Sequence, residues 1–173
     1  MLLKIENLAP KKIINIYLPQ NILPQNKAFV LDRSLSTQTE FLNNLCLIEG
    51  IERVLITDNI ISCKYFGSEA DDIKSLLMAE IDDYLAQTNT LLTEDFSCDL
   101  YNLAEALADA LIRPTLNRDN GDIKIISVEK DTLTLTFTGH CAGCPYAQNT
   151  LKNVIERVFL RYIPQLKKIV LQE

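Results

Sequence analysis

Residues 120–145 have the sequence NGDIKIISVEKDTLTLTFTGHCAGCP, which contains the strongest structural signals in the chain. The Asn-Gly pair at its start is a strong turn signal, and apolar residues then alternate with polar ones in two short runs. We expect strands over residues 123–129 and 132–138, joined as a hairpin by the two residues between them. Pro145 suits the first position of a helix, where the missing N–H is not needed. The stretch therefore predicts a hairpin, a loop and a helix in succession.

The residues on both sides of this stretch extend the same domain. Before it, residues 99–112 have apolar side chains at helical spacing, and Pro114 is expected to end that helix. After it, the helix that begins at Pro145 is expected to run to about Tyr162, and residues 168–171 supply a last short strand. The second half of the chain thus predicts a domain of order α-β-β-α-β.

The first half of the chain predicts another small domain, of order β-β-α-β-β-α. Its expected strands cover residues 12–18, 27–31, 51–57 and 60–66, and its expected helices cover 37–48 and 69–87. Periodicity then fails from Thr88 to Ser97. We therefore expect an α+β fold of two small α+β domains, residues 1–88 and 99–173, joined by a linker over 89–98.

Composition narrows the class of protein. Of 173 residues, 47% are hydrophobic and 23% charged, which is typical of a globular chain. No apolar run is long enough to span a bilayer, and the start MLLKIENLAPKK lacks the features of a signal peptide. Five cysteines are an odd number, which favours reduced thiols over a disulfide framework. We expect a cytoplasmic protein, or one of the mitochondrial matrix if the sequence is a mature eukaryotic form.

Charge is distributed unevenly along the chain. The net charge is −6; residues 1–99 carry 8 Lys and Arg against 15 Asp and Glu, and residues 100–173 carry 9 against 8. Without a tryptophan or a cluster of basic residues, the chain is a poor candidate for binding nucleic acid, whose phosphates require clustered cations. Acidic surface of this kind more often keeps a protein soluble and steers basic partners toward it.

The segment GHCAGCP, residues 139–145, is the candidate site. Cys141 and Cys144 are separated by two residues, so a turn can bring both sulfurs to one side, where they can bind a soft metal. The glycines of the segment permit a tight backbone. Cys144 directly precedes the expected helix, whose unpaired N–H groups and dipole favour the thiolate form. We therefore expect Cys141 and Cys144 to be metal-binding thiolates.

Several kinds of site use such a pair. A thioredoxin-like redox site also places CxxC at the start of a helix, but the proline here follows the second cysteine and no βαβ unit surrounds the motif. A zinc knuckle needs four ligands, and the chain has no second CxxC motif or histidine pair. An iron–sulfur cluster also takes about four thiolates, so either another cysteine joins or a second copy of the chain supplies two more.

The other three cysteines are weaker candidates. Cys46 and Cys63 lie on an apolar helix and an apolar strand, so we expect them to be small core residues. Cys98 lies near the expected linker and has no assigned role. A two-fold axis would double the Cys141–Cys144 pair to four thiolates, which favours a cluster shared between two chains. His140, the only histidine, is expected to be an ordinary loop residue, with a ligand role as the alternative.

Residues 111–170 closely resemble the C-terminal domain of NifU-like proteins. The matching positions, in order, are Arg113-Pro114, Leu116, Asp119, Gly121-Asp122-Ile123, Gly139, Cys141, Gly143-Cys144-Pro145, Thr150-Leu151-Lys152 and Ile155-Glu156. Residues 41–65, FLNNLCLIEGIERVLITDNIISCKY, are similar to the N-terminal domain of the two-domain Nfu-type branch. The chain departs from the family pattern at Asn120, where a glycine is usual, and at His140, where a small residue is usual. Ala9-Pro10 stands where an Asn-Pro-Asn start is usual.

The resemblance implies an iron–sulfur cluster scaffold or carrier, not an enzyme. It would hold a cluster, 4Fe-4S sooner than 2Fe-2S, between the CxxC motifs of a homodimer, with Cys141 and Cys144 as ligands. The implied partners are upstream cluster-assembly proteins and the apo iron–sulfur proteins that receive the cluster. Two alternatives stay open: a thiol–disulfide oxidoreductase that uses the same cysteines, and an adaptor whose acidic first domain recruits partners.

Overall fold

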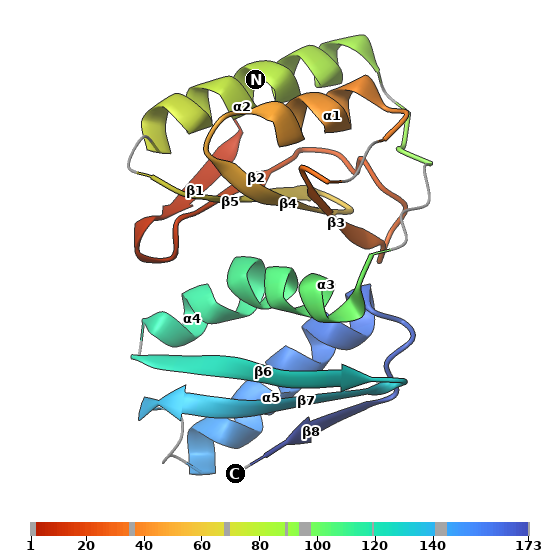
Figure 1. Cartoon of the computed structure of the whole chain (residues 1–173). Coiled ribbons are helices and arrows are strands. Elements are labelled where there is room, and N and C mark those ends of the chain that lie inside the picture. The colour runs from red at the N-terminus through yellow and green to blue at the C-terminus, as the bar shows by residue number, and fades with distance from the viewer. Residues whose placement is uncertain are drawn as a thin grey trace. The chain divides into compact units, whose positions relative to one another are not determined.

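The computed structural model describes residues 3–34, 37–67, 70–88, 90–93, 98–118, 120–140 and 145–172 (Figure 1). The chain divides into two compact units, Met1–Cys98 and Asp99–Glu173, and each contains both helices and a sheet. The expected α+β fold of two small domains is therefore confirmed. In the part of the chain described, none of the helices combines the length and the hydropathy needed to cross a bilayer.

The first unit consists of a five-stranded antiparallel sheet and two helices. In chain order its elements are β1 (Lys4–Leu8), the short 3-10 turn η1 (Ala9–Lys11), β2 (Ile13–Tyr17), β3 (Ala28–Asp32), α1 (Glu40–Leu47), β4 (Ile51–Thr57), β5 (Ile60–Tyr65) and α2 (Ala70–Gln87). The strands lie in the order β1-β2-β5-β4-β3. The predicted hairpin β4–β5 is confirmed, including its turn at residues 58–59.

The predicted element order of this unit was wrong at its start, because β1 was missed. In the sequence KIENL, apolar and polar residues alternate only weakly and two side chains are charged, so the pattern does not indicate a strand. Charged side chains are common on strands at the edge of a sheet. Side chains across the β1–β2 pair stabilise it: the Tyr17 hydroxyl donates a hydrogen bond to Glu6 (2.7 Å), and Lys4 Nζ lies 4.4 Å from the centre of the Tyr17 ring. The unit therefore has the order β-β-β-α-β-β-α.

The helices α1 and α2 cover one face of this sheet (Figure 1). Their buried leucine and isoleucine side chains pack in one core cluster with strand residues that lie two apart, such as Ile14 and Ile16 of β2. The rings of Phe41 and Tyr84 stack with their centres 4.0 Å apart, joining the two helices. This core is the apolar support of the first unit.

The chain that follows α2 stays attached to the first unit. Within the range expected as a linker, Leu92 is buried in the core of the unit, and its N–H donates to the carbonyl oxygen of Ile22 (2.7 Å). Cys98 is partly buried and packs against the same core.

The second unit contains a three-stranded sheet with helices before and after its hairpin. In chain order its elements are α3 (Leu100–Leu107), the π-helical turn η2 (Ala108–Ile112), α4 (Arg113–Asn117), β6 (Gly121–Glu129), β7 (Thr132–Gly139), α5 (Pro145–Tyr162) and β8 (Lys168–Leu171). The strand order is β6-β7-β8; β6 pairs antiparallel with β7, and β8 pairs parallel with it. The predicted order α-β-β-α-β holds if α3, η2 and α4 are taken as one interrupted helix.

Pro114 does not end the helix, contrary to expectation. The backbone passes through the π-helical turn η2 and continues as α4, in which Pro114 occupies the first turn. A proline is tolerated there because its missing N–H has no partner to lose in a first turn. The wider π-helical turn thus restarts the helix just before the proline.

The hairpin, α5 and β8 agree with the predicted positions. Lys130 has a φ of 53° in the turn between β6 and β7, where a positive value is needed. Alternate residues of β7, Leu133, Leu135 and Phe137, are buried, and the threonines between them are not. The sheet therefore buries one face, as alternation predicts.

Candidate metal centre

Cys141 and Cys144, the predicted metal ligands, lie in the stretch 141–144, outside the described residues. The structure does describe both ends of the connection that contains them. β7 ends at Gly139, and α5 begins at Pro145. The contacts that hold the end of β7 are the part of the site that the structure describes.

The end of β7 is fixed against the turn that precedes β6. The N–H of His140 donates to the carbonyl oxygen of Asn120 (3.1 Å), and Gly139 is paired with Gly121. Gly139 has a φ of 65°, and a Cβ at this position would collide with the Asn120 carbonyl oxygen. Only glycine fits here without strain. The glycine expected to permit a tight backbone has that role in the structure.

Asn120 forms the other side of this contact. Its φ of 55° is in the left-handed region, which asparagine accepts more readily than most residues. Its N–H donates to the carbonyl oxygen of Asn117 (3.2 Å), the last residue of α4. The turn between α4 and β6 therefore places the carbonyl group to which the end of β7 is bound.

A buried ion-pair network holds the start of β6. Arg113, only 8% exposed, donates through Nη1 to the carboxylates of Glu105 and Asp109, both at 2.7 Å. Its Nη2 and Nε donate to the carbonyl oxygen of Ile123 (3.1 and 3.3 Å), and Nε lies 3.2 Å from the carboxylate of Asp122. The network links the interrupted helix to the strand that begins beside Asn120.

The charge on Arg113 is favoured despite its burial. Burial alone lowers the pKa of the guanidinium, but hydrogen bonds and Coulombic attraction from Glu105 and Asp109 outweigh it and raise the pKa. From the sequence, Arg113-Pro114 is identified only as a family motif, and this network was not predicted. The spacing of these residues could have indicated the network. Glu105, Asp109 and Arg113 are four residues apart, which puts them on one helix face.

The two core cysteines of the first unit, Cys46 and Cys63, are poor metal ligands. Cys46 is 5% exposed and Cys63 fully buried, which confirms that both are core residues. Burial, with a further contribution from the charge of Asp32, raises the pKa of Cys46 to about 11, and burial also raises the pKa of Cys63. Both therefore stay protonated thiols at neutral pH. Among the described residues, no group of three Cys, His, Asp or Glu could hold a metal ion.

His140 is exposed at the end of β7, and its described contact is the backbone hydrogen bond to Asn120. The structure places its backbone but gives its side chain no ligand role. The expectation of an ordinary loop residue stays a prediction.

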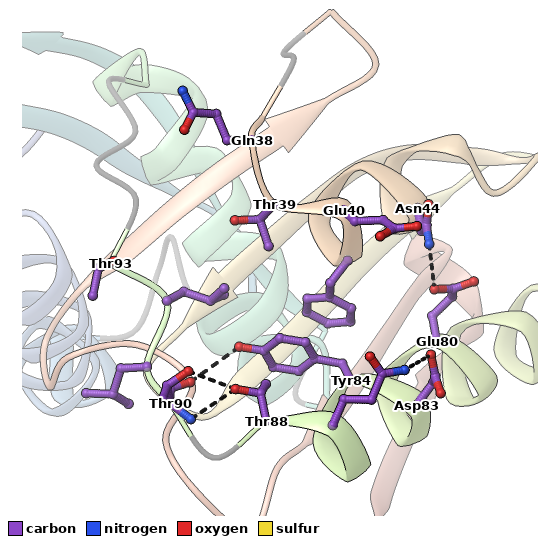
Figure 2. A pocket seen from close by; sticks show the side chains of 14 residues that line it. Gln38, Thr39, Glu40, Asn44, Glu80, Asp83, Tyr84, Thr88, Thr90 and Thr93 are labelled. Carbon is purple, nitrogen blue, oxygen red and sulfur yellow. Dashed lines mark hydrogen bonds between the residues drawn. The ribbon is translucent and has the colours of Figure 1, made fainter.

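The first unit also has a polar hollow of about 650 Å³ between α1, α2 and the residues that follow α2 (Figure 2). Its side chains are tied to one another: Asn44 donates to Glu80 (3.1 Å), and the hydroxyls of Thr88 and Thr90 lie 2.8 Å apart. Among the described residues that line it there is no cysteine or histidine. The hollow lies where the chain folds back onto α2, and it lacks the chemistry of a soft-metal site.

Comparison with known proteins finds a family that matches most of the second unit. A family model described as the NifU-like domain matches residues 105–170. Two similar relatives, both described as "NFU1 iron-sulfur cluster scaffold homolog, mitochondrial", come from Drosophila persimilis and Drosophila grimshawi. They are 31% and 32% identical, over 70% of this chain in each case and over 47% and 45% of the relatives. The chain thus spans about half the length of these relatives.

A solved structure, protein SAV1430 from Staphylococcus aureus, matches 47% of this chain and 99% of its own, at 14% identity and a TM-score of 0.41, too weak a likeness to support any conclusion. The assignment rests instead on the family match, which covers α4, the hairpin, the cysteine pair and α5. Residues 105–170 therefore match the NifU-like domain, and this matching part of the chain contains Cys141 and Cys144.

Proposed function

We propose that this chain is an iron–sulfur cluster scaffold or carrier that holds its cargo through Cys141 and Cys144 and passes it to apo-proteins. The observation that carries the proposal is the position of the CxxC pair: it lies inside the NifU-like domain, in the connection between Gly139 and Pro145. The relatives are named as iron–sulfur cluster scaffold homologs, which supports the same role here. The cluster is cargo, so the chain is a carrier and not an enzyme.

The donor chemistry fits an iron–sulfur cargo. Two thiolates two residues apart suit a soft metal centre, and Cys144 immediately precedes α5, whose N-terminal N–H groups favour negative charge. The end of β7 is fixed by the hydrogen bond from the N–H of His140 to Asn120. The connection that contains both cysteines therefore starts from a fixed point.

Two copies of the chain are needed to complete the ligand set. A four-iron cluster takes about four thiolates, and one chain offers two that are adjacent. The three remaining cysteines belong to the first unit, and Cys46 and Cys63 are buried there as thiols. We therefore propose one 4Fe-4S cluster per two chains, ligated by Cys141 and Cys144 from each, so that the loaded form is a homodimer.

Transfer then proceeds by ligand exchange without a change of oxidation state. A thiol of the apo-protein loses its proton and binds an iron atom as thiolate, while Cys141 or Cys144 releases that iron and takes up a proton. Upstream assembly proteins load the cluster by the reverse exchange. This chemistry requires reduced thiols, which favours the cytoplasm or, for a mature organellar form, the mitochondrial matrix.

The two units would divide this work. Residues 99–173 form the cluster-binding domain, while residues 1–88, as a domain of the N-terminal Nfu type, contribute to partner choice. The range 89–98, expected as the linker, packs on the first unit through Leu92 and Cys98.

Anaerobic reconstitution with iron and sulfide, followed by native mass spectrometry of the full chain, tests the proposal. We expect two chains with one four-iron cluster, and a broad visible absorption from charge transfer between sulfur and iron. Cys141→Ser and Cys144→Ser should each abolish both the cluster and the dimer, because each removes two of four ligands. Cys98→Ser is the matched control and should leave iron content per chain unchanged.

Three results would overturn parts of this proposal. A cluster on a single chain would exclude sharing, and loss of iron from a folded Cys98→Ser variant would require another ligand set. A protein that stays colourless and instead reduces disulfides catalytically, with loss of that activity in Cys141→Ser, would establish the oxidoreductase alternative.

A further inference from the structure

The first unit carries a small hollow at one end of its sheet, which we call the apolar notch. It has a volume of about 270 Å³ and is lined by Glu49, Gly50, Phe66, Gly67, Asp72, Ile73 and Leu76. Two large apolar side chains stand at it half exposed, Phe66 at 54% and Leu76 at 52%. An aromatic and an aliphatic side chain thus expose carbon surface beside the same hollow.

The backbone forms the floor of the notch. Gly50, before β4, and Gly67, after β5, have φ values of 88° and 87°, in the region that favours glycine. The N–H of Phe66 donates to the carbonyl oxygen of Gly50 (2.9 Å), which ties the two strand ends together. A Cβ on Gly50 would lie 2.9 Å from Cδ1 of the buried Ile73. Gly50 therefore leaves no room for a side chain beside Ile73.

The notch carries negative charge on its wall. Among the described residues that line it, the charged ones are the carboxylates Glu49 and Asp72, and the nearby Arg33 is engaged by the carbonyl oxygen of Ile48, to which its Nη2 donates (3.1 Å). Residues 1–98 as a whole carry 8 Lys and Arg against 14 Asp and Glu. A partner that fills the notch therefore gains from positive charge beside its apolar group.

We propose that the apolar notch docks a segment of a partner protein that inserts one bulky apolar side chain against Phe66 and Leu76 and presents lysine or arginine to Glu49 and Asp72. The apolar contact supplies affinity, because it removes half-exposed carbon surface from water. The carboxylates select for basic flanks. A symmetric contact with a second copy is disfavoured, because it would bring four carboxylates together. The notch contains no cysteine, so this proposal stands apart from cluster binding.

The test uses the full-length, 15N-labelled apo-protein and three synthetic twelve-residue peptides. The first carries a central Leu-Phe pair flanked by lysines; in the second the pair is Ser-Ser, and in the third the lysines are glutamates. We expect the first peptide to shift the amide signals of Gly50 and Gly67 in a saturable way. The other two should bind at least tenfold more weakly.

Substitutions on α2 make the test specific. Leu76→Glu should weaken binding of the first peptide at least tenfold, and Asp72→Lys should weaken it several-fold while reducing its salt dependence. Both residues are solvent-exposed, so the fold should be kept. Asp82→Lys makes the same change of charge at an exposed position of α2 outside the notch and should leave binding unchanged.

Three outcomes would overturn the proposal. Equal binding of all three peptides, or equal weakening by Asp72→Lys and Asp82→Lys, would mean that only general charge is recognised. Saturable shifts that leave Gly50 and Gly67 unmoved would place the binding elsewhere. Shifts of those two glycines with protein concentration alone would show that a second copy fills the notch.

Discussion

The two units use cysteine in opposite settings. In the first unit, Cys46 and Cys63 lie among leucines and isoleucines, where burial raises their pKa and keeps them as thiols. In the second unit, Cys141 and Cys144 belong to a connection whose starting strand is fixed by a turn and a charged network. The comparison teaches that the surroundings of a cysteine in the fold, beyond its presence in the sequence, determine the pKa of its thiol and so its readiness to bind a metal.

The same contrast applies to what holds each unit together. The helices of the first unit join its sheet through an apolar cluster, whereas those of the second also depend on the buried charge of Arg113. Substitutions that disturb electrostatics should therefore affect the second unit first. Hydrogen exchange of the full chain, followed peptide by peptide, can measure the two units separately.

The largest effect is expected from Arg113→Met. It leaves the carboxylates of Glu105 and Asp109 buried without their partner and should lower the stability of the second unit by roughly 3–5 kcal/mol. Protection of the first unit's core amides should not change. Neutralising both carboxylates as well, with Glu105→Gln and Asp109→Asn, should recover much of the loss. Equal loss of protection in both units would contradict a network confined to the second.

An intermediate effect is expected from a matched pair of glycine substitutions. Gly139→Ala and Gly50→Ala both force alanine to a positive φ, a strain of about 1–3 kcal/mol. At Gly139 the new Cβ meets the backbone carbonyl of Asn120, whereas at Gly50 it meets the end of the flexible Ile73 side chain. Gly139→Ala should thus cost more, act on the second unit and lower cluster occupancy after reconstitution. Denaturant unfolding measures both; a larger cost at Gly50 would show that the Asn120 turn can move.

The smallest effect is expected from alkaline pH on the first unit. The pKa of Cys46 is raised in the folded state, so its contribution is fully present below about pH 9 and is lost as the pH rises toward 11. Tyr17, whose pKa is raised to about 12 by burial and by Glu6, acts in the same direction. Burial of Cys63 acts in the same direction, so Cys46 contributes about 1 kcal/mol of the loss at pH 10 and not the whole of it. The unfolding midpoint, measured between pH 8 and 10.5, should fall less steeply with pH in Cys46→Ala than in the unchanged protein. An unchanged slope would show that Cys46 does not contribute to the loss.

Local signals determined how much of the fold could be predicted. The turn at Lys130, the helix that starts at Pro145 and the final strand follow from side chains within a few residues of each element. β1 could not be predicted from its own residues, because their alternation is weak and the strand is stabilised by its pairing with β2. The expected stop at Pro114 was wrong because a π-helical turn places the proline in a first turn.

The site could be predicted only in part, because several of its contacts join residues that are far apart in the sequence. Cys141 and Cys144 were identified from spacing and flanking residues, and their ligand role stays a prediction, because they lie outside the described residues. The contact of Gly139 with Asn120 joins residues almost twenty positions apart, and the contact of Arg113 with Ile123 crosses from helix to strand. Such contacts depend on tertiary packing, which no local pattern encodes.

The parallel pairing of β8 with β7 has a consequence for biosynthesis. β6 is made before β7, but β8 follows the cysteine loop and all of α5. At roughly 5–20 residues per second, the ribosome therefore exposes both thiols a few seconds before the second edge of β7 can be paired. During that interval an unpaired strand edge and the two cysteines of the CxxC motif share one nascent segment. The three-stranded sheet can be completed only after residue 171 has emerged, so protection of the nascent chain by a chaperone is most valuable before that point.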